Sequence, residues 1–132
     1  MSALSDKSNL NISAAELLYK ENHYDSVCHP AYYACLQLIK HTLCKNGISL
    51  EQQAIEASSS YRGNTHQYLI EKMKLMVNNK RGTNDGNDFR RKIRDLKLTR
   101  EDSDYKDIRI SSDTSRKSIN LAKELQLVIQ SV

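Results

Sequence analysis

The residues best suited to chemistry form a basic run in the second half of the chain. Residues 80–100 hold eight basic side chains and only three aspartates. Guanidinium and ammonium groups at this density can follow the phosphates of a nucleic acid backbone. A solvated helix face has the same composition, so this feature alone leaves both interpretations open. The basic side chains are Lys80, Arg81, Arg90, Arg91, Lys92, Arg94, Lys97 and Arg100.

Five residues within this run are candidate nucleic-acid-binding residues. The only aromatic residue between positions 80 and 100 is Phe89, so stacking on the bases of a single strand is not predicted. The candidates are therefore phosphate contacts, and they are Arg90, Arg91, Lys92, Arg94 and Arg100.

Other common catalytic patterns are missing from the sequence. Cys28, Cys35 and Cys44 form no C-x-x-C pair, and we expect them to be small buried residues and not metal ligands or disulfide partners. The glycines at 82 and 86 are not followed by the Lys-Ser/Thr of a P-loop. No Ser-His-Asp set or metal-ligand cluster is evident, and we expect neither a metal nor a cofactor.

Length and composition restrict the architecture that must position these residues. The chain has 132 residues with a net charge of +4, which fits a single domain spanning 1–132. Four glycines and one proline argue against a turn-rich β-sandwich. No apolar run is long enough for a membrane span or a signal peptide, so we expect no membrane association and a cytoplasmic location. Residues 1–8 have no apolar pattern and are expected to be a flexible N-terminus.

Hydrophobic periodicity predicts an all-α fold of four or five helices in an antiparallel bundle. The first helix spans about 9–22 and the second about 24–44, with Pro30 near its first turn or at a bend. Asn46-Gly47 ends the second helix, and Asn64 with Gln67 opens a later one. Segments 58–64 and 78–88 are predicted to be loops. A helix begins at about residue 88, and the last is capped by Ser112 or Asp113.

Several motifs follow one another in a fixed order along the chain. An Ala-Ala-Glu-Leu-Leu run is followed by a Tyr-Tyr-Ala core, a histidine that opens the third helix, and a basic penultimate helix. An arginine and an Asp-Tyr pair come next, followed by a final helix with an alanine between large apolar residues. These motifs cover about residues 10–130, and their residues are 14–18, Tyr24, 31–34, His66, 89–98, Arg100, Asp104, Tyr105, Ile119, Ala122 and Leu125. The ordered set resembles the HEPN superfamily (higher eukaryotes and prokaryotes nucleotide-binding domains), in its compact prokaryotic branch.

The resemblance implies a fold, partners and an activity. The fold would be an up-and-down four-helix bundle with an extra short helix, which usually dimerises through a helical face. Family members often act with a small nucleotidyltransferase in toxin–antitoxin or defence modules. Active members are metal-independent endoribonucleases with an Arg, then four to six residues, then a His. In that signature the arginine stabilises charge on the scissile phosphate, and the histidine moves protons.

This sequence departs from that signature at the histidine. Arg100 is followed after four residues by Tyr105, and no arginine in the chain is followed by a histidine at the family spacing. A tyrosine hydroxyl ordinarily titrates near pH 10 and is a poor general base at neutral pH. The catalytic candidates are therefore Arg100, Tyr105 and His66, and the Arg100, Asp104 and Tyr105 group either locks the last loop to the bundle or contacts a ligand.

Three functions remain as hypotheses. The sequence favours a non-catalytic HEPN-like module that binds a partner protein, such as a nucleotidyltransferase or a second copy, and also nucleotide or RNA. The alternatives are a metal-independent endoribonuclease and a plain helical adaptor. The missing Arg-to-His spacing disfavours the endoribonuclease, and the basic run disfavours the adaptor.

Overall fold

A computed structural model describes residues 2–132 of the chain. Between these residues the chain forms six α-helices and one short 3₁₀-helix, with no strand, which confirms the all-α prediction. The elements are α1 (Ala3–Lys20), η1 (Tyr24–Ser26), α2 (Cys28–Lys45), α3 (Leu50–Tyr61), α4 (Thr65–Arg81), α5 (Thr83–Tyr105) and α6 (Ser112–Gln130).

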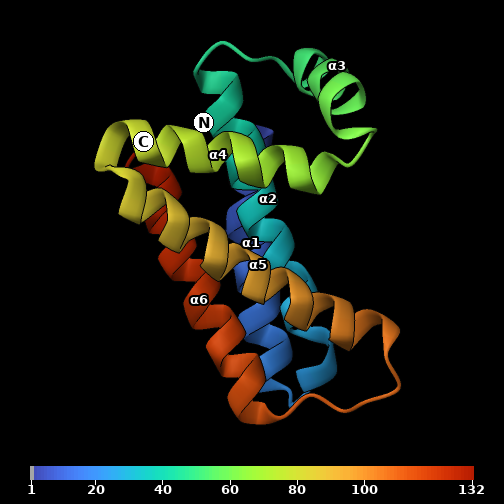
Figure 1. Ribbon diagram of the computed structural model, residues 1–132. Helices are drawn as coiled ribbons and strands as arrows, with labels where there is room; N and C mark the ends of the chain where they lie inside the picture. The colour runs from blue at the N-terminus through green and yellow to red at the C-terminus, as the bar shows by residue number, and fades with distance from the viewer. Residues whose placement is uncertain (1) are drawn as a thin grey trace.

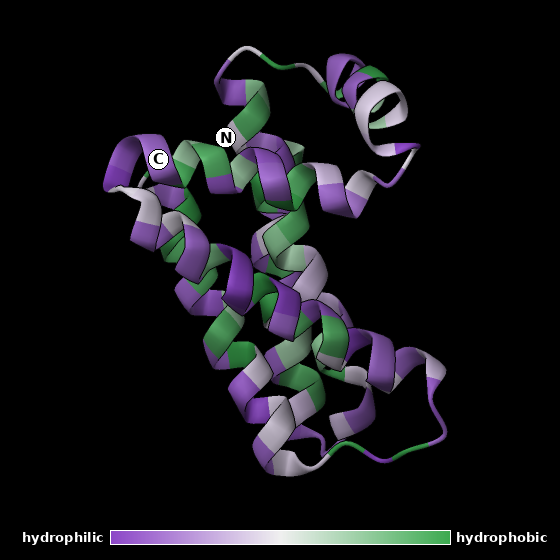
Figure 2. Ribbon diagram, viewed as in Figure 1, coloured by the Kyte–Doolittle hydropathy of each residue, from purple (hydrophilic) through white to green (hydrophobic). Residues whose placement is uncertain are grey.

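Helix α2 lies at the centre of the molecule and packs against α1, α5 and α6, which together make a four-helix bundle (Figure 1). Helix α4 crosses one end of this bundle, and α3 packs on α4 (Figure 1). Two helices therefore lie outside the bundle, where one was expected. The buried face of α2 is apolar almost throughout, whereas α5 is drawn largely in purple in Figure 2 because its outer side is polar and charged.

The signals predicted to end α2 and to open α4 are confirmed by backbone geometry, although α2 begins at Cys28, after η1, and not at about residue 24. Pro30 lies in the first turn of α2, where its missing N–H is not needed. Gly47 follows α2 with a φ of +89°, a conformation that glycine adopts without strain. The Asn64 side chain accepts a hydrogen bond from the Gln67 backbone N–H and so caps α4.

The flexible N-terminus expected over residues 1–8 is wrong for the part that the structure describes. Helix α1 already begins at Ala3, capped by the Ser2 hydroxyl, and Met1 lies outside the described residues. Ser8 is completely buried, and its hydroxyl donates to the Ala34 carbonyl of α2 at 2.6 Å. A small polar side chain with a hydrogen-bond partner thus packs in the core, where hydrophobic periodicity predicts an apolar residue.

The loop expected over residues 58–64 is largely helical. Helix α3 continues to Tyr61, and the connection to α4 is only three residues long. Arg62 and Gly63 adopt positive φ angles of 53° and 81°, which reverse the chain within this short space. In the last helix the cap is Ser111, one residue before the expected position.

The loop expected over residues 78–88 is also wrong, because this segment is a tight helical hairpin. Helix α4 runs to Arg81, Gly82 turns the chain with a φ of +108°, and α5 begins at once. Gly86 is buried where the two helices meet, and a Cβ there would lie 1.5 Å from Asn78 Oδ1. The missing side chain lets the helices approach closely, so the segment packs without any apolar residue.

Candidate functional site

Three helix segments bring the catalytic candidates together at one place. The first turns of α2 contribute Tyr32 and Tyr33, the start of α4 contributes His66, and the end of α5 contributes Arg100 and Tyr105. We call these five residues, with Asp104 and His29, the Arg100 cluster. The structure therefore places all three catalytic candidates of the sequence in one cluster.

Arg100 is the centre of this cluster and is buried, with 5% of its surface exposed. Its Nη1 donates to Tyr105 Oη at 3.2 Å and to Asp104 Oδ2 at 3.5 Å. Its guanidinium carbon lies 5.3, 5.5 and 5.6 Å from the ring centres of Tyr32, Tyr33 and Tyr105. Three aromatic faces and one carboxylate thus stabilise a charge that is costly to bury alone.

The inward position of Arg100 follows from the helical period of α5. Phe89, Ile93 and Leu96 are buried at intervals of four and three residues, and Arg100 continues the same stripe after another four. The guanidinium is therefore directed toward α2. Its Nε is buried without a hydrogen-bond partner among the described residues.

His66 is held by Tyr32 on the other side of the cluster. The Tyr32 hydroxyl and His66 Nδ1 are 3.1 Å apart. Burial lowers the pKa of His66 below its usual 6.5, and the positive charge of Arg100 adds to this effect. A neutral imidazole whose Nδ1 accepts a hydrogen bond from the Tyr32 hydroxyl fits this environment. Burial also raises the pKa of the Tyr32 hydroxyl, which remains the donor.

His29 also belongs to this site, although the sequence pattern did not predict it. His29 Nδ1 lies 2.7 Å from Asp104 Oδ2, and its ring centre is 4.7 Å from that of Tyr33. Half of its side chain is exposed. The two residues are 75 positions apart, so no local pattern in the sequence could pair them.

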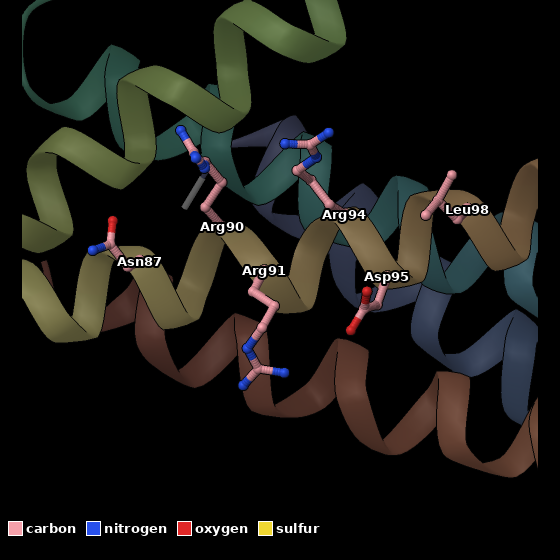
Figure 3. Close-up of a pocket in the computed structure, with 6 residues that line it drawn as sticks. All are labelled: Asn87, Arg90, Arg91, Arg94, Asp95 and Leu98. Atoms are coloured by element: carbon pink, nitrogen blue, oxygen red, sulfur yellow. The ribbon is translucent and has the colours of Figure 1, made fainter.

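A second feature is an open hollow of about 490 Å³ on the outer side of α5. Three of the five nucleic-acid candidates, Arg90, Arg91 and Arg94, line it, and Figure 3 shows Arg90 and Arg94 on one side of the helix and Arg91 on the other. We call this feature the arginine hollow. Its full lining is Asn87, Arg90, Arg91, Arg94, Asp95 and Leu98.

The three arginines differ in how far nearby carboxylates neutralise them. Arg90 pairs with Glu71 of α4 at 3.3 Å, and Arg91 pairs with Asp88 at 2.6 Å. Arg94 forms no ion pair within residues 2–132, and it also lines a smaller hollow between α4 and α5. The charge of Arg94 is therefore the most available to an incoming anion.

The remaining two nucleic-acid candidates lie elsewhere. Lys92 faces α6, where its ammonium group contacts Glu124 and also Asp88. Arg100 belongs to the buried cluster described above. The structure thus divides the predicted set into a surface group of three and two residues engaged in other contacts.

The cysteines match the prediction of small packed residues. Cys28 and Cys35 are completely buried, and burial raises the pKa of the Cys28 thiol to about 11. Cys44 is partly buried, and its sulfur accepts from the Gln53 amide at 3.4 Å. In the described part of the chain, no group of three or more His, Cys, Asp or Glu side chains could hold a metal ion.

No helix in residues 2–132 is long and apolar enough to span a membrane.

Comparisons with known proteins point to one family. No curated protein sequence and no solved structure matches the chain significantly. The family model described as HEPN domain, however, matches residues 1–131. This match covers nearly the whole sequence, and it agrees with the all-α fold. The chain belongs to the HEPN family.

Proposed function

We propose that this chain is a cytoplasmic HEPN module that binds RNA through the arginine hollow and acts with a partner protein, without cleaving the RNA itself. The observation that carries the proposal is the hollow, an open surface of α5 that Arg90, Arg91 and Arg94 all line. Guanidinium groups bind phosphate oxygens through paired hydrogen bonds, which makes arginine the preferred residue for such contacts.

The arrangement around Arg100 supports binding without cleavage. Tyr105 occupies the position where active family members carry a histidine, and its hydroxyl is bonded to Arg100. The guanidinium of Arg100 is enclosed by tyrosine rings and by Asp104, which leaves little of it exposed to a scissile phosphate. Both observations agree with a site that does not cleave RNA.

The test of RNA binding compares two basic residues only two positions apart. Arg94→Gln removes a cation without a carboxylate partner, and Lys92→Gln removes one that faces Glu124 outside the hollow. Fluorescence anisotropy with a labelled RNA measures both affinities over a range of salt concentrations. We expect Arg94→Gln to weaken binding and to reduce the salt slope by about 0.7 for each lost phosphate contact. Equal effects of the two variants would contradict a role for the hollow.

The partner is a nucleotidyltransferase or a second copy of the chain, as in relatives of this family. Large apolar side chains exposed on the surface agree with association. Leu10 and Leu17, seven residues apart on α1, are 67% and 60% exposed. Sedimentation at micromolar concentration should show a species larger than 15.1 kDa, and a purely monomeric boundary would contradict self-association.

A second candidate function, metal-independent RNA cleavage, is favoured by one specific observation. His29 and His66 both pack against Tyr33, next to Arg100, so imidazoles are present although the motif lacks its histidine. An RNase assay in EDTA decides between the two functions. We expect no cleavage above background from the wild type. Robust cleavage that Arg100→Ala abolishes would instead establish the endoribonuclease.

The variant Tyr105→His tests the same point from the opposite direction. It restores the family spacing of Arg, four residues and His. General acid–base catalysis contributes about 10²–10⁴-fold in rate, so a gain of cleavage in this variant would show that only the histidine was missing.

A further inference from the structure

Tyr105 is the most exposed of the large hydrophobic side chains, with 76% of its surface accessible. It is the last residue of α5, and one face of its ring lies over the Arg100 guanidinium at 5.6 Å. Its hydroxyl oxygen accepts a hydrogen bond from the same guanidinium. The ring is thus held on one side by a buried cation, while the other side is open to solvent.

The helical period places Tyr105 on the same side of α5 as Leu98 and Arg94, two of the residues that line the arginine hollow. Leu98 lines the hollow, and Tyr105 follows it by seven residues, which is two helical turns. Arg94 precedes Tyr105 by eleven residues, or about 16 Å along the helix axis. A single chain of a few nucleotides can therefore contact Arg94 and Tyr105 together.

The charges along α5 change between these two points. Arg90, Arg91 and Arg94 lie at the hollow, whereas Glu101 and Asp102 precede Tyr105. Glu101 repels a phosphate, and Lys106, the cation next to Tyr105, is paired with Asp102 at 2.8 Å, so the nucleic acid contact at Tyr105 is with a base and not with the backbone. An exposed aromatic ring offers that contact, because every base has a face on which an aromatic ring can stack.

We propose that Tyr105 is a stacking platform for an unpaired base, so that the RNA bound by this chain is single-stranded. This inference rests on the proposed RNA binding. In it, the arginine hollow contacts the phosphates of the RNA, and Tyr105 adds a preference for unpaired bases. The sequence argued against stacking because Phe89 is the only aromatic residue in the basic run. Phe89 is 1% exposed, whereas Tyr105, just outside that run, is 76% exposed.

The test measures the affinity of a labelled single-stranded RNA and of a duplex of the same sequence. Tyr105→Leu removes the ring, Tyr105→Phe keeps the ring without the hydroxyl, and Tyr61→Leu is the control at a tyrosine on α3. Circular dichroism and thermal unfolding first establish that each variant is folded. The Arg94→Gln variant is measured alongside them.

We expect Tyr105→Leu to bind the single strand about tenfold more weakly, which corresponds to about 1.4 kcal/mol and lies within the range for one stacked base. Tyr61→Leu should bind like the wild type, and Tyr105→Phe should lose less affinity than Tyr105→Leu because it keeps the ring. The salt slope should stay the same in Tyr105→Leu, because no phosphate contact is lost. Purine-rich strands should lose more affinity than pyrimidine-rich strands, because purines stack more strongly.

Three outcomes would overturn this inference, and the failure of the platform alone can be told apart from the failure of RNA binding. If Arg94→Gln weakens binding and Tyr105→Leu does not, RNA binding stands and the stacking platform is wrong. If the wild type binds neither the single strand nor the duplex, the proposed function fails and the platform fails with it. A preference of the wild type for the duplex would also contradict the platform.

Discussion

Gly86 allows a quantitative prediction, because the structure shows what an added methyl group would meet. In Gly86→Ala the new Cβ would lie 1.5 Å from Asn78 Oδ1 and 2.4 Å from Asn78 Cγ. The Asn78 side chain can rotate away, but the Lys74 carbonyl oxygen at 2.9 Å is backbone and cannot move without shifting α4. The helix pair must therefore separate slightly.

Two opposing terms set the size of this effect. Alanine is favoured over glycine within a helix by about 1 kcal/mol. Overpacking a close contact costs about 1–3 kcal/mol. We expect Gly86→Ala to lower the free energy of unfolding by about 1 kcal/mol, which corresponds to a fall of about 4 °C in Tm for a chain of this size.

Thermal and urea unfolding, followed by circular dichroism at 222 nm, measure the change. Asn84→Ala, at an exposed position in the same helix, is the control and should be neutral or slightly stabilising. In the double variant Asn78→Ala, Gly86→Ala the carboxamide is absent, so part of the loss should be recovered, with a coupling energy of about 0.5–1 kcal/mol. A Gly86→Ala variant more stable than the wild type would refute the close packing of α4 on α5.

Three further predictions follow from the buried groups. Burial lowers the pKa of His66 in the folded state, so the contribution of His66 to the free energy of unfolding should be complete above pH 6.5 and lost as the pH falls. Urea unfolding at several pH values measures this dependence, and His66→Gln should flatten it. Arg100→Ala should lower the free energy of unfolding by about 2–4 kcal/mol, since it empties a packed site and removes a partner of Asp104. Ellman's reagent should modify Cys44 first in the folded protein, and Cys28 only on unfolding, because burial raises the pKa of that thiol.

Each of these predictions has an outcome that would contradict it. A stability that rises as the pH falls from 6.5 would oppose the proposed environment of His66. An Arg100→Ala variant as stable as the exposed-site variant Arg91→Ala would show that the tyrosine rings do not need the cation. Three thiols that react equally fast in the native protein would contradict the burial of Cys28.

The sequence by itself determined the elements whose signals are local. The stripe of Phe89, Ile93 and Leu96 predicts which side of α5 is buried, and its extension reaches Arg100. The Asn64 cap and the Gly47 terminus identify where helices begin and end. These signals depend on helical period and on the backbone preferences of single residues, which require no knowledge of distant segments.

Local signals failed where packing uses small or polar residues. Ser8 is buried through one hydrogen bond, and Gly86 is buried because it has no side chain. Neither residue adds to an apolar stripe, so segments 1–8 and 78–88 were expected to be flexible or looped. The helical structure of these segments depends on how closely a second helix packs against them. The sequence pattern of the segment itself gives no information on that packing distance.

Only the tertiary structure decided which functional side chains act together. Arg90 and Arg94 are indistinguishable in the sequence, but Glu71 of α4 reaches only Arg90. His29 joins the Arg100 cluster because α2 and α5 cross where Asp104 can bond it. Tyr105 is open to solvent because the bundle covers only the side of α5 that holds Arg100. The helical period determines the direction in which each side chain leaves its own helix. The residue that the side chain then contacts depends on where helices far apart in the sequence cross.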